Sequence, residues 1–123
     1  MLKFLLDEHI SPAVADGLRR RDRSLVVFCL GEWEDGEFLG QPDSVCLQEA
    51  ALQRLTLVTY DRRTIPLLLK IWAEEDQIHG GVIFVDEKTI SPSDTGGLVR
   101  ALMNLSKATA NWNWSNRVYF LRR

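Results

Sequence analysis

The sequence predicts a single α/β domain over residues 1–123, with a mainly parallel β-sheet covered by helices on both faces, in three layers. The chain has 123 residues, the usual size of one domain with one core. Short and almost wholly apolar segments recur along it, as in strands that are buried on both faces. They alternate with segments of helical character, and this alternation is typical of parallel sheets.

The first half of the chain contains three predicted strands, Leu2–Leu6, Leu25–Leu30 and Leu55–Tyr60. Ser11-Pro12 predicts the start of a helix after the first strand, because Ser is a good N-cap and Pro suits the first turn. Pro42-Asp43 predicts the start of the helix before the third strand. The segment between, Gly31–Gln41, is rich in Gly and Glu without a period, which indicates a loop.

The second half repeats this pattern. A helix is predicted over Ile65–Ile78, and Gly80-Gly81 then breaks the chain before the strand Val82–Val85. Ser91-Pro92 predicts another helix start, with the helix continuing over Leu98–Leu105. After a polar and aromatic loop, the last predicted strand is Val118–Leu121.

Composition narrows the classes of protein. Apolar residues make up 46% and charged residues 26%, and the net charge is −2, so no basic field covers the whole molecule. No signal-peptide pattern and no apolar run of ~18–20 residues is present, which predicts a cytoplasmic protein outside the membrane. Cys29 and Cys46 lack metal-ligand spacing, so we expect reduced thiols. Walker A, Gly-x-Gly-x-x-Gly and Gly-x-Ser-x-Gly motifs are absent.

Acidic residues stand where a parallel sheet would bring them together. Asp7 follows the first strand, Asp61 follows the third, and Asp43 starts the helix between the second and third. Right-handed crossovers place the carboxyl ends of parallel strands at one edge, and ligands of open α/β sheets bind there. We therefore expect Asp7, Asp43 and Asp61 to converge. The candidate accessory residues are Glu8, His9 and Glu49.

Converging carboxylates predict a cation. They repel one another and raise one another's pKa values unless a positive ion neutralises them. Hard oxygen ligands select Mg²⁺ or Mn²⁺ over zinc, and such ions in enzymes usually act on phosphate with water as the nucleophile. Each carboxylate also has a purely structural interpretation: Asp43 as a helix N-cap, Asp61 as a turn residue, and Asp7 in a solvated loop. Their convergence favours the functional interpretation.

Four segments carry a family resemblance. The motifs FLLDEHISP (Phe4–Pro12), PDSVCLQEA (Pro42–Ala50), LTLVTYD (Leu55–Asp61) and HGGVIFV (His79–Val85) together resemble the PIN-like domain family known as DUF5615, which is related to the Mut7-C domains. The resemblance runs in order over about residues 2–105. It implies a PIN-like three-layer α/β/α fold and a Mg²⁺- or Mn²⁺-dependent ribonuclease, often the toxin of a toxin–antitoxin pair. By position, its metal-binding and catalytic residues are Asp7, Asp43 and Asp61.

The chain departs from the family pattern beside Asp61. Relatives usually carry a second Asp two positions later, followed by Phe, and here those positions hold Arg63 and Thr64. His9 stands where relatives often have Asn. Arg62 and Arg63 have two interpretations, which stay open: they bind RNA phosphates as charge-assisted donors, or they neutralise a site that has lost a carboxylate.

The resulting functional hypothesis is a metal-dependent ribonuclease of PIN-like type. The expected partners are RNA, an antitoxin-like protein and a second copy of the chain in a homodimer. Aromatic residues in predicted loops have two interpretations that stay open, contact surface or core; they are Trp33, Phe38, Trp112 and Trp114.

Two alternatives accompany this hypothesis. One is a catalytically degenerate PIN-like domain that only binds protein or RNA. The other is a phospho-receiver-like signalling domain, which also has an acidic pair after the first strand and an Asp after the third. Its chemistry needs Ser or Thr after the fourth strand and Lys after the fifth, where this chain has Asp86 and no Lys.

Overall fold

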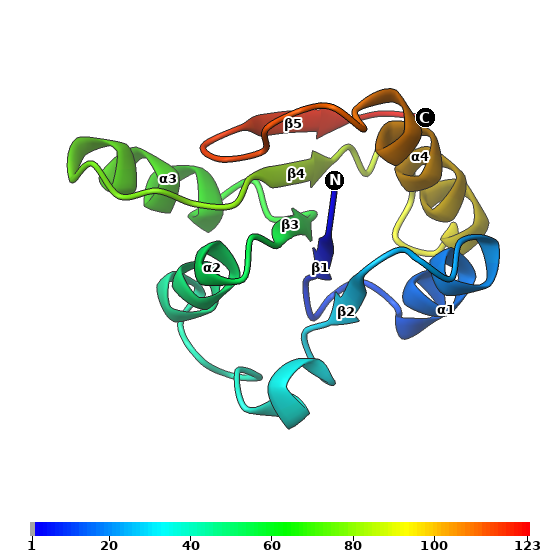
Figure 1. Cartoon of the computed structure of the whole chain (residues 1–123), viewed down its shortest axis with the longest axis horizontal. Coiled ribbons are helices and arrows are strands. Elements are labelled where there is room, and N and C mark those ends of the chain that lie inside the picture. The colour runs from blue at the N-terminus through cyan, green and yellow to red at the C-terminus, as the bar shows by residue number, and fades with distance from the viewer. Residues whose placement is uncertain (1) are drawn as a thin grey trace.

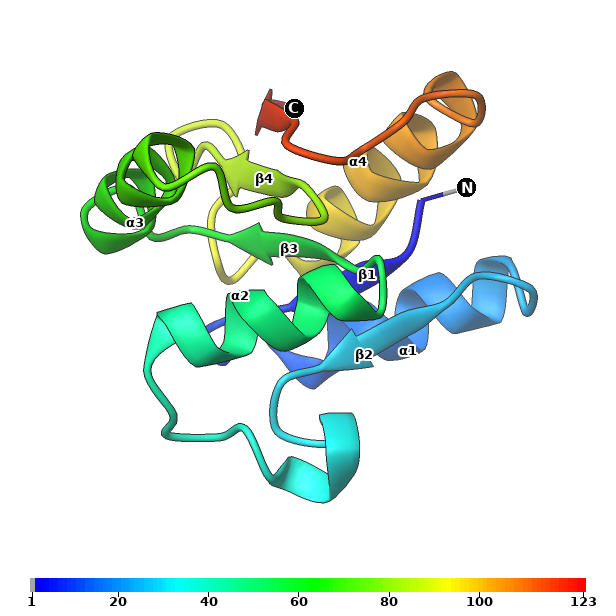
Figure 2. The ribbon, with the colours of Figure 1, turned by 60° about the vertical axis from the view of Figure 1, so that its left-hand side comes forward.

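The computed structural model describes residues 2–123, an α/β domain built on one five-stranded sheet (Figures 1 and 2). The strands are β1 (Phe4–Leu6), β2 (Val27–Cys29), β3 (Thr56–Thr59), β4 (Val82–Val85) and β5 (Val118–Leu121). Their order is β2-β1-β3-β4-β5, and all neighbouring strands are parallel. This is the doubly wound order of flavodoxin-like domains, in which the ligand crevice lies at the carboxyl ends of β1 and β3.

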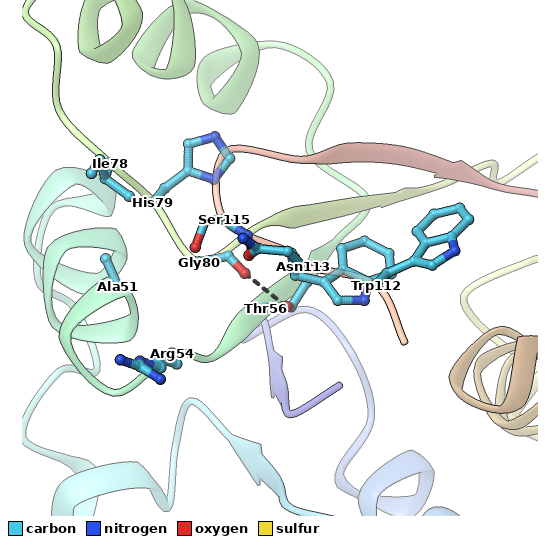
Figure 3. A pocket seen from close by; sticks show the side chains of 10 residues that line it. Ala51, Arg54, Thr56, Ile78, His79, Gly80, Trp112, Asn113 and Ser115 are labelled. Carbon is cyan, nitrogen blue, oxygen red and sulfur yellow. Dashed lines mark hydrogen bonds between the residues drawn. The ribbon is translucent and has the colours of Figure 1, made fainter. Parts of the chain in front are cut away.

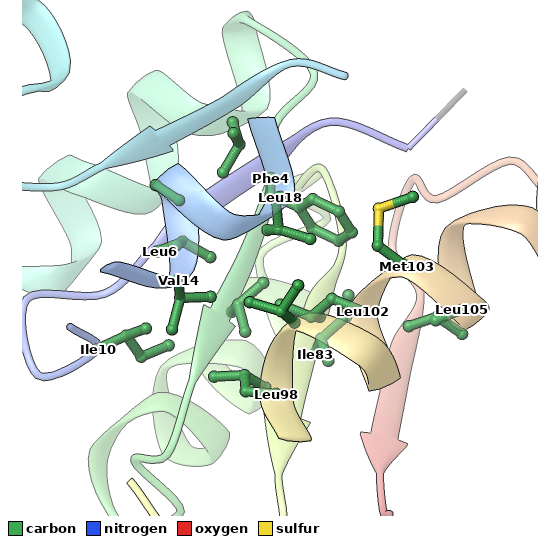
Figure 4. Close-up of a cluster of buried hydrophobic side chains, with 14 of the residues drawn as sticks. Phe4, Leu6, Ile10, Val14, Leu18, Ile83, Leu98, Leu102, Met103 and Leu105 are labelled. Atoms are coloured by element: carbon green, nitrogen blue, oxygen red, sulfur yellow. The ribbon is translucent and has the colours of Figure 1, made fainter. Parts of the chain in front are cut away.

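Helices cover both faces, so the predicted three layers are confirmed. Helices α1 (Pro12–Arg21) and α4 (Thr95–Ala108) share one face, and α2 (Asp43–Leu52) and α3 (Thr64–Glu74) share the other (Figure 1). Each pair of helices packs against its face of the sheet and forms a separate apolar core. Figure 4 shows the first core, where side chains of α1 and α4 such as Val14, Leu18 and Leu102 meet Phe4 and Ile83 of the sheet. In the second core, residues of α2 and α3 pack on the opposite face of the same strands.

One crossover departs from the expected hand. The chain advances in the same direction across the sheet from β3 to β4 and from β4 to β5, yet α3 packs on one face and α4 on the other. The β3–α3–β4 and β4–α4–β5 connections therefore have opposite hands, and the expectation that every crossover is right-handed is wrong. Tyr119 and Leu121 of β5 pack in the α1 and α4 core, whereas Val118 and Phe120 are exposed on the face that carries α3.

Several element boundaries also differ from the expectation. Ser11 caps α1 as predicted, and its hydroxyl accepts a hydrogen bond from the Ala13 N–H. The second Ser-Pro pair forms a turn instead, because α4 begins later, where the Asp94 carboxylate accepts the Gly97 N–H. Helix α3 ends at Glu74 rather than at residue 78, since Asp76 adopts a left-handed conformation with φ of 56°.

The predicted loop 31–41 contains a short 3-10 segment, Trp33–Gly36, that anchors it to the domain. Trp33 is buried, stacks on Phe38 at 4.7 Å between ring centroids, and donates its indole N–H to Gln53. Trp33 is therefore a core residue and not a contact residue. Cys29 and Cys46 are free, buried thiols, as expected. Among the described residues, no helix has the length and apolar character needed to cross a membrane.

Candidate functional site

The Thr59 hydroxyl joins the carboxyl ends of the two central strands, β1 and β3. Thr59 is the last residue of β3 and is fully buried. Its Oγ1 donates to Asp7 Oδ2 at 2.7 Å and accepts the backbone N–H of Asp61 at 3.0 Å. The Thr of the Thr-x-Asp motif therefore fixes Asp7 and Asp61 relative to each other across the strand pair.

Asp61 lies in the turn from β3 to α3, two residues before Arg63, which is the N-cap of that helix. Its Oδ1 accepts the backbone N–H groups of Arg63 at 2.8 Å and Thr64 at 3.0 Å, and its Oδ2 accepts the Thr64 hydroxyl. Burial alone would raise the pKa of Asp61, but these hydrogen bonds outweigh it and hold the pKa below the ordinary value. Asp61 thus has the predicted structural role while remaining ionised at the sheet edge.

Asp43 comes to the same place from α2. It is the first residue of the helix, Pro42 is the N-cap, and no side chain caps this helix end. The N-cap interpretation of Asp43 is therefore wrong. Its Oδ2 lies 3.5 Å from the Thr64 hydroxyl, which also contacts Asp61. Partial burial and then the charges of Asp7 and Asp61 raise the pKa of Asp43, so the three carboxylates are close enough to repel one another.

Two of the three accessory residues lie beside these carboxylates. The backbone N–H of Glu8 donates to Asp7 at 2.8 Å, and the Glu8 charge adds to the rise in the Asp43 pKa. His9 lies 3.7 Å from the Glu8 carboxylate, and its charge contributes to the lowered pKa of Asp61.

Glu49 does not join the site. It lies six residues beyond Asp43 on the same helix, a rise of about 9 Å along the axis. Its carboxylate accepts a hydrogen bond from Gln53 at 3.1 Å instead. The expectation for Glu49 was wrong because a helix carries successive turns away from the sheet edge.

A cleft with charges of both signs opens beside Asp61. It encloses about 290 Å³ between the ends of β3 and β4. Arg62 and Arg63 line it and are exposed, and neither belongs to an ion pair found within residues 2–123. The Arg62 guanidinium lies over the Phe120 ring, 5.6 Å from its centroid. The remaining charged residues of the cleft are Asp86, Glu87 and Lys88.

Three residues at this edge were missed by reasoning from the sequence. Thr59 and Thr64 hold the carboxylates, and Phe120 presents an exposed ring beside Arg62. The Thr-x-Asp spacing and the hydroxyl three positions after Asp61 were available signals for the two threonines. Nothing in the sequence around residue 120 distinguishes an exposed ring from a core ring in an apolar strand.

The donor set suits a hard divalent cation. Each ionised carboxylate offers about four lone-pair positions, so Asp7 and Asp61 keep acceptor capacity beyond their present hydrogen bonds, and Asp43 keeps the most. Within residues 2–123, no group of three or more His, Cys, Asp or Glu side chains is already placed to hold a metal ion. Binding a cation would therefore require these side chains to move toward one another.

A second cavity, of about 520 Å³, lies at the opposite edge of the sheet, where Arg54 at the end of α2 and Trp112 and Asn113 of the loop before β5 contribute side chains (Figure 3). The Thr56 hydroxyl donates to the Gly80 carbonyl at its floor. No carboxylate lines this cavity, so it lacks the negative charge that the carboxyl edge offers to a cation. The smaller cleft lies at the carboxyl edge, where α/β sheets bind ligands, and of the three predicted carboxylates Asp61 lines it.

Fold and site together define a class: an α/β domain of flavodoxin-like strand order with three carboxylates at its central carboxyl edge. Comparison with models of known protein families, with characterised protein sequences and with solved structures finds no match. The PIN-like resemblance therefore stays a prediction from the sequence motifs.

Proposed function

We propose that this protein is a metal-dependent ribonuclease of PIN-like type, acting in the cytoplasm on single-stranded RNA. The observation that carries the proposal is the pair of threonine hydroxyls that links Asp7, Asp43 and Asp61. Thr59 joins Asp7 to Asp61, and Thr64 lies between Asp61 and Asp43. A fold that needed these carboxylates only as surface charges would not require buried or bridging hydroxyls between them.

Asp7, Asp43 and Asp61 would hold Mg²⁺ or Mn²⁺. When bound, such an ion orients a phosphodiester, lowers the pKa of water and stabilises the departing oxygen. The protein's own contribution is to orient Asp7 through the Thr59 hydroxyl, and to hold Asp61 in place and ionised through hydrogen bonds that include the Thr64 hydroxyl. Glu8 and His9 border the carboxylates on the β1 side.

Arg63 supports the phosphate-binding interpretation more than the neutralising one. It makes no ion pair with Asp61 among the described residues, although its backbone N–H donates to that carboxylate. Its side chain lines the cleft and is free to meet a phosphate oxygen with two parallel hydrogen bonds. At the position of a second carboxylate, its charge would also repel a second cation, which favours a single bound ion.

The proposal extends to a protein partner, as an antitoxin-like protein or a second copy of the chain. Most of the large exposed apolar side chains lie on α2 and on and just after α3. An uneven distribution of this kind is typical of a contact surface. These residues are Val45, Leu52, Leu67, Ile71 and Ile78.

Two other functions compete with the nuclease. The strand order favours the phospho-receiver alternative, but Asp86 follows β4 and Arg122 follows β5. In addition, the Asp61 carboxylate already accepts the backbone N–H groups of Arg63 and Thr64. The other alternative is a degenerate domain that binds RNA or protein without cleaving RNA. It would have the same contacts as the nuclease, so only an assay of RNA cleavage distinguishes the two.

The test is cleavage of a labelled single-stranded RNA by purified protein with Mn²⁺, with Mg²⁺ and with chelator. We expect cleavage with either ion and none with chelator. Asp43→Asn and Asp61→Asn keep the side-chain shape but remove charge, so each should slow cleavage at least about 100-fold, since an active-site cation contributes several kcal/mol.

Asp76→Asn is the matched control. Asp76 is exposed, lies beyond the end of α3, and has a left-handed backbone that Asn also adopts. It should cleave at the wild-type rate. Equal cleavage by wild type and Asp43→Asn would assign the activity to a contaminant or to another site, and no cleavage by well-folded wild type would leave the binding-only alternative.

A further inference from the structure

An exposed aromatic ring lies level with the end of β3. The register pairs Thr59 with Phe84 and Phe84 with Phe120, so Phe120 lies two strands from the residue that holds Asp7. At ~4.8 Å per strand, this is a distance of about 10 Å across the sheet. The Phe120 side chain is 56% exposed, while its neighbour Phe84, at 5.5 Å between ring centroids, is buried.

The Arg62 guanidinium lies over this ring and leaves more than half of Phe120 exposed. The guanidinium carbon is 5.6 Å from the Phe120 centroid, and Arg62 directly follows Asp61 in the chain. A planar cation over an aromatic ring is a surface on which a nucleobase stacks, and proteins hold single-stranded RNA on aromatic rings and guanidinium planes. The adjoining cleft carries the carboxylates of Asp61, Asp86 and Glu87 as well as two further exposed cations, Arg63 and Lys88, which complement phosphate groups.

We propose that Phe120 and Arg62 form a stacking platform for one base of a single-stranded RNA whose phosphate lies at the Asp7–Asp61 edge. This inference rests on the proposed function, because the RNA on the platform is the RNA that the carboxylates act on. Phe120 stays 56% exposed and Arg62 is exposed as well, so a base can reach this pair. In this arrangement the planar guanidinium of Arg62 stacks on the base, and Arg63 makes the charged contact with the phosphate.

The test is binding of a fluorescent 12-nucleotide single-stranded RNA, measured by anisotropy with chelator present so that no cleavage occurs. Phe120→Ala should weaken binding about 5- to 100-fold, the range for one stacked base. The loss should be equal at low and moderate salt, because stacking releases no counterions. Phe120→Trp should restore binding, and Arg62→Ala should weaken it.

Val118→Ala is the matched control, since Val118 is exposed on the same face of the same strand but at its far end. It should bind as the wild type does. Wild-type affinity in Phe120→Ala, or absence of RNA binding by the wild type, would overturn the platform. A change in hydrodynamic mass in Phe120→Ala with unchanged RNA affinity would instead assign the ring to a protein interface.

This measurement separates the platform from the nuclease. RNA binding that depends on Phe120, without cleavage under Mn²⁺, would retain the platform and reject the catalytic proposal. Cleavage that depends on Asp43, with binding indifferent to Phe120, would do the reverse.

Discussion

The ionised forms of Asp61 and Asp43 have opposite effects on the stability of the fold, although both side chains lie beside the Thr64 hydroxyl. The hydrogen bonds that Asp61 accepts favour its ionised form, so it stabilises the fold above the unfolded-state pKa near 3.9. Asp43 caps nothing, and burial with neighbouring negative charge disfavours its ionised form. A carboxylate that costs stability is typical of a site retained for function.

Asp43→Asn should therefore stabilise the protein at pH 7 in the presence of chelator. The folded-state pKa of Asp43 lies above the unfolded value, so the cost of ionisation is present above the folded pKa and disappears as the pH falls toward 3.9. Thermal unfolding of wild type and variant from pH 7 to pH 3.5 measures this. A higher Tm at pH 7 that converges with the wild type at low pH is expected. A lower Tm at pH 7 would mean that Asp43 makes a stabilising contact.

At the scale of elements, β3 begins and ends with a buried threonine, and the two hydroxyls have different hydrogen-bond partners. Thr56 donates to the Gly80 carbonyl at 2.8 Å at the edge far from the carboxylates, and Thr59 donates to Asp7 at the carboxylate edge. Both side chains are buried within the same strand, so they form a matched pair for separating stability from metal binding.

Thr56→Val and Thr59→Val should each lower the free energy of unfolding by about 1–3 kcal/mol, because each leaves a half-buried partner without its hydrogen bond. Only Thr59→Val should weaken Mn²⁺ binding, by about 10- to 100-fold, the usual effect of removing a group that orients a metal ligand. Thermal unfolding and calorimetric Mn²⁺ titration measure the two effects. Equal Mn²⁺ affinity in both variants would show that Thr59 does not position the site.

The elements differ in how far the sequence predicts them. The predicted bounds of β4 and β5 are those of the structure, because apolar runs between loop residues leave little ambiguity. The later start of α4 was missed, because Asp94 and Ser91-Pro92 are both plausible helix starts locally. The convergence of Asp7, Asp43 and Asp61 was predictable from the rule that the carboxyl ends of parallel strands meet at one edge of the sheet. Its threonine links depend on side-chain directions that no periodicity encodes.

The face on which α4 packs depends on residues distant in the chain. Gly17 of α1 leaves room for Val99 of α4, since a Cβ at Gly17 would lie 2.8 Å from Val99 Cγ2. This close approach lets the two helices share one core, although the hand of the crossover would place α4 elsewhere. Such a long-range fit between two helices could not be read from local patterns.

At the scale of the whole molecule, charge and apolar surface are distributed unevenly. The net charge of −2 gives no general attraction for RNA, so binding has to come from local cations at the carboxyl edge, with Arg63 and Lys88 in the cleft. The exposed apolar side chains lie mostly on the α2 and α3 face. Of the aromatic residues predicted to form contact surfaces, Trp112 is exposed, and Trp33 and Trp114 are buried.

The central claim is that Asp7, Asp43 and Asp61 form one divalent-cation site. The most direct measurement is an anomalous difference map from crystals soaked in Mn²⁺. We expect one peak at the carboxyl edge of β1 and β3, bounded by oxygens of these three carboxylates, and its loss in Asp43→Asn crystals soaked in the same way. A map without a peak at that edge under saturating Mn²⁺, or one whose peak persists unchanged in Asp43→Asn, would contradict the account.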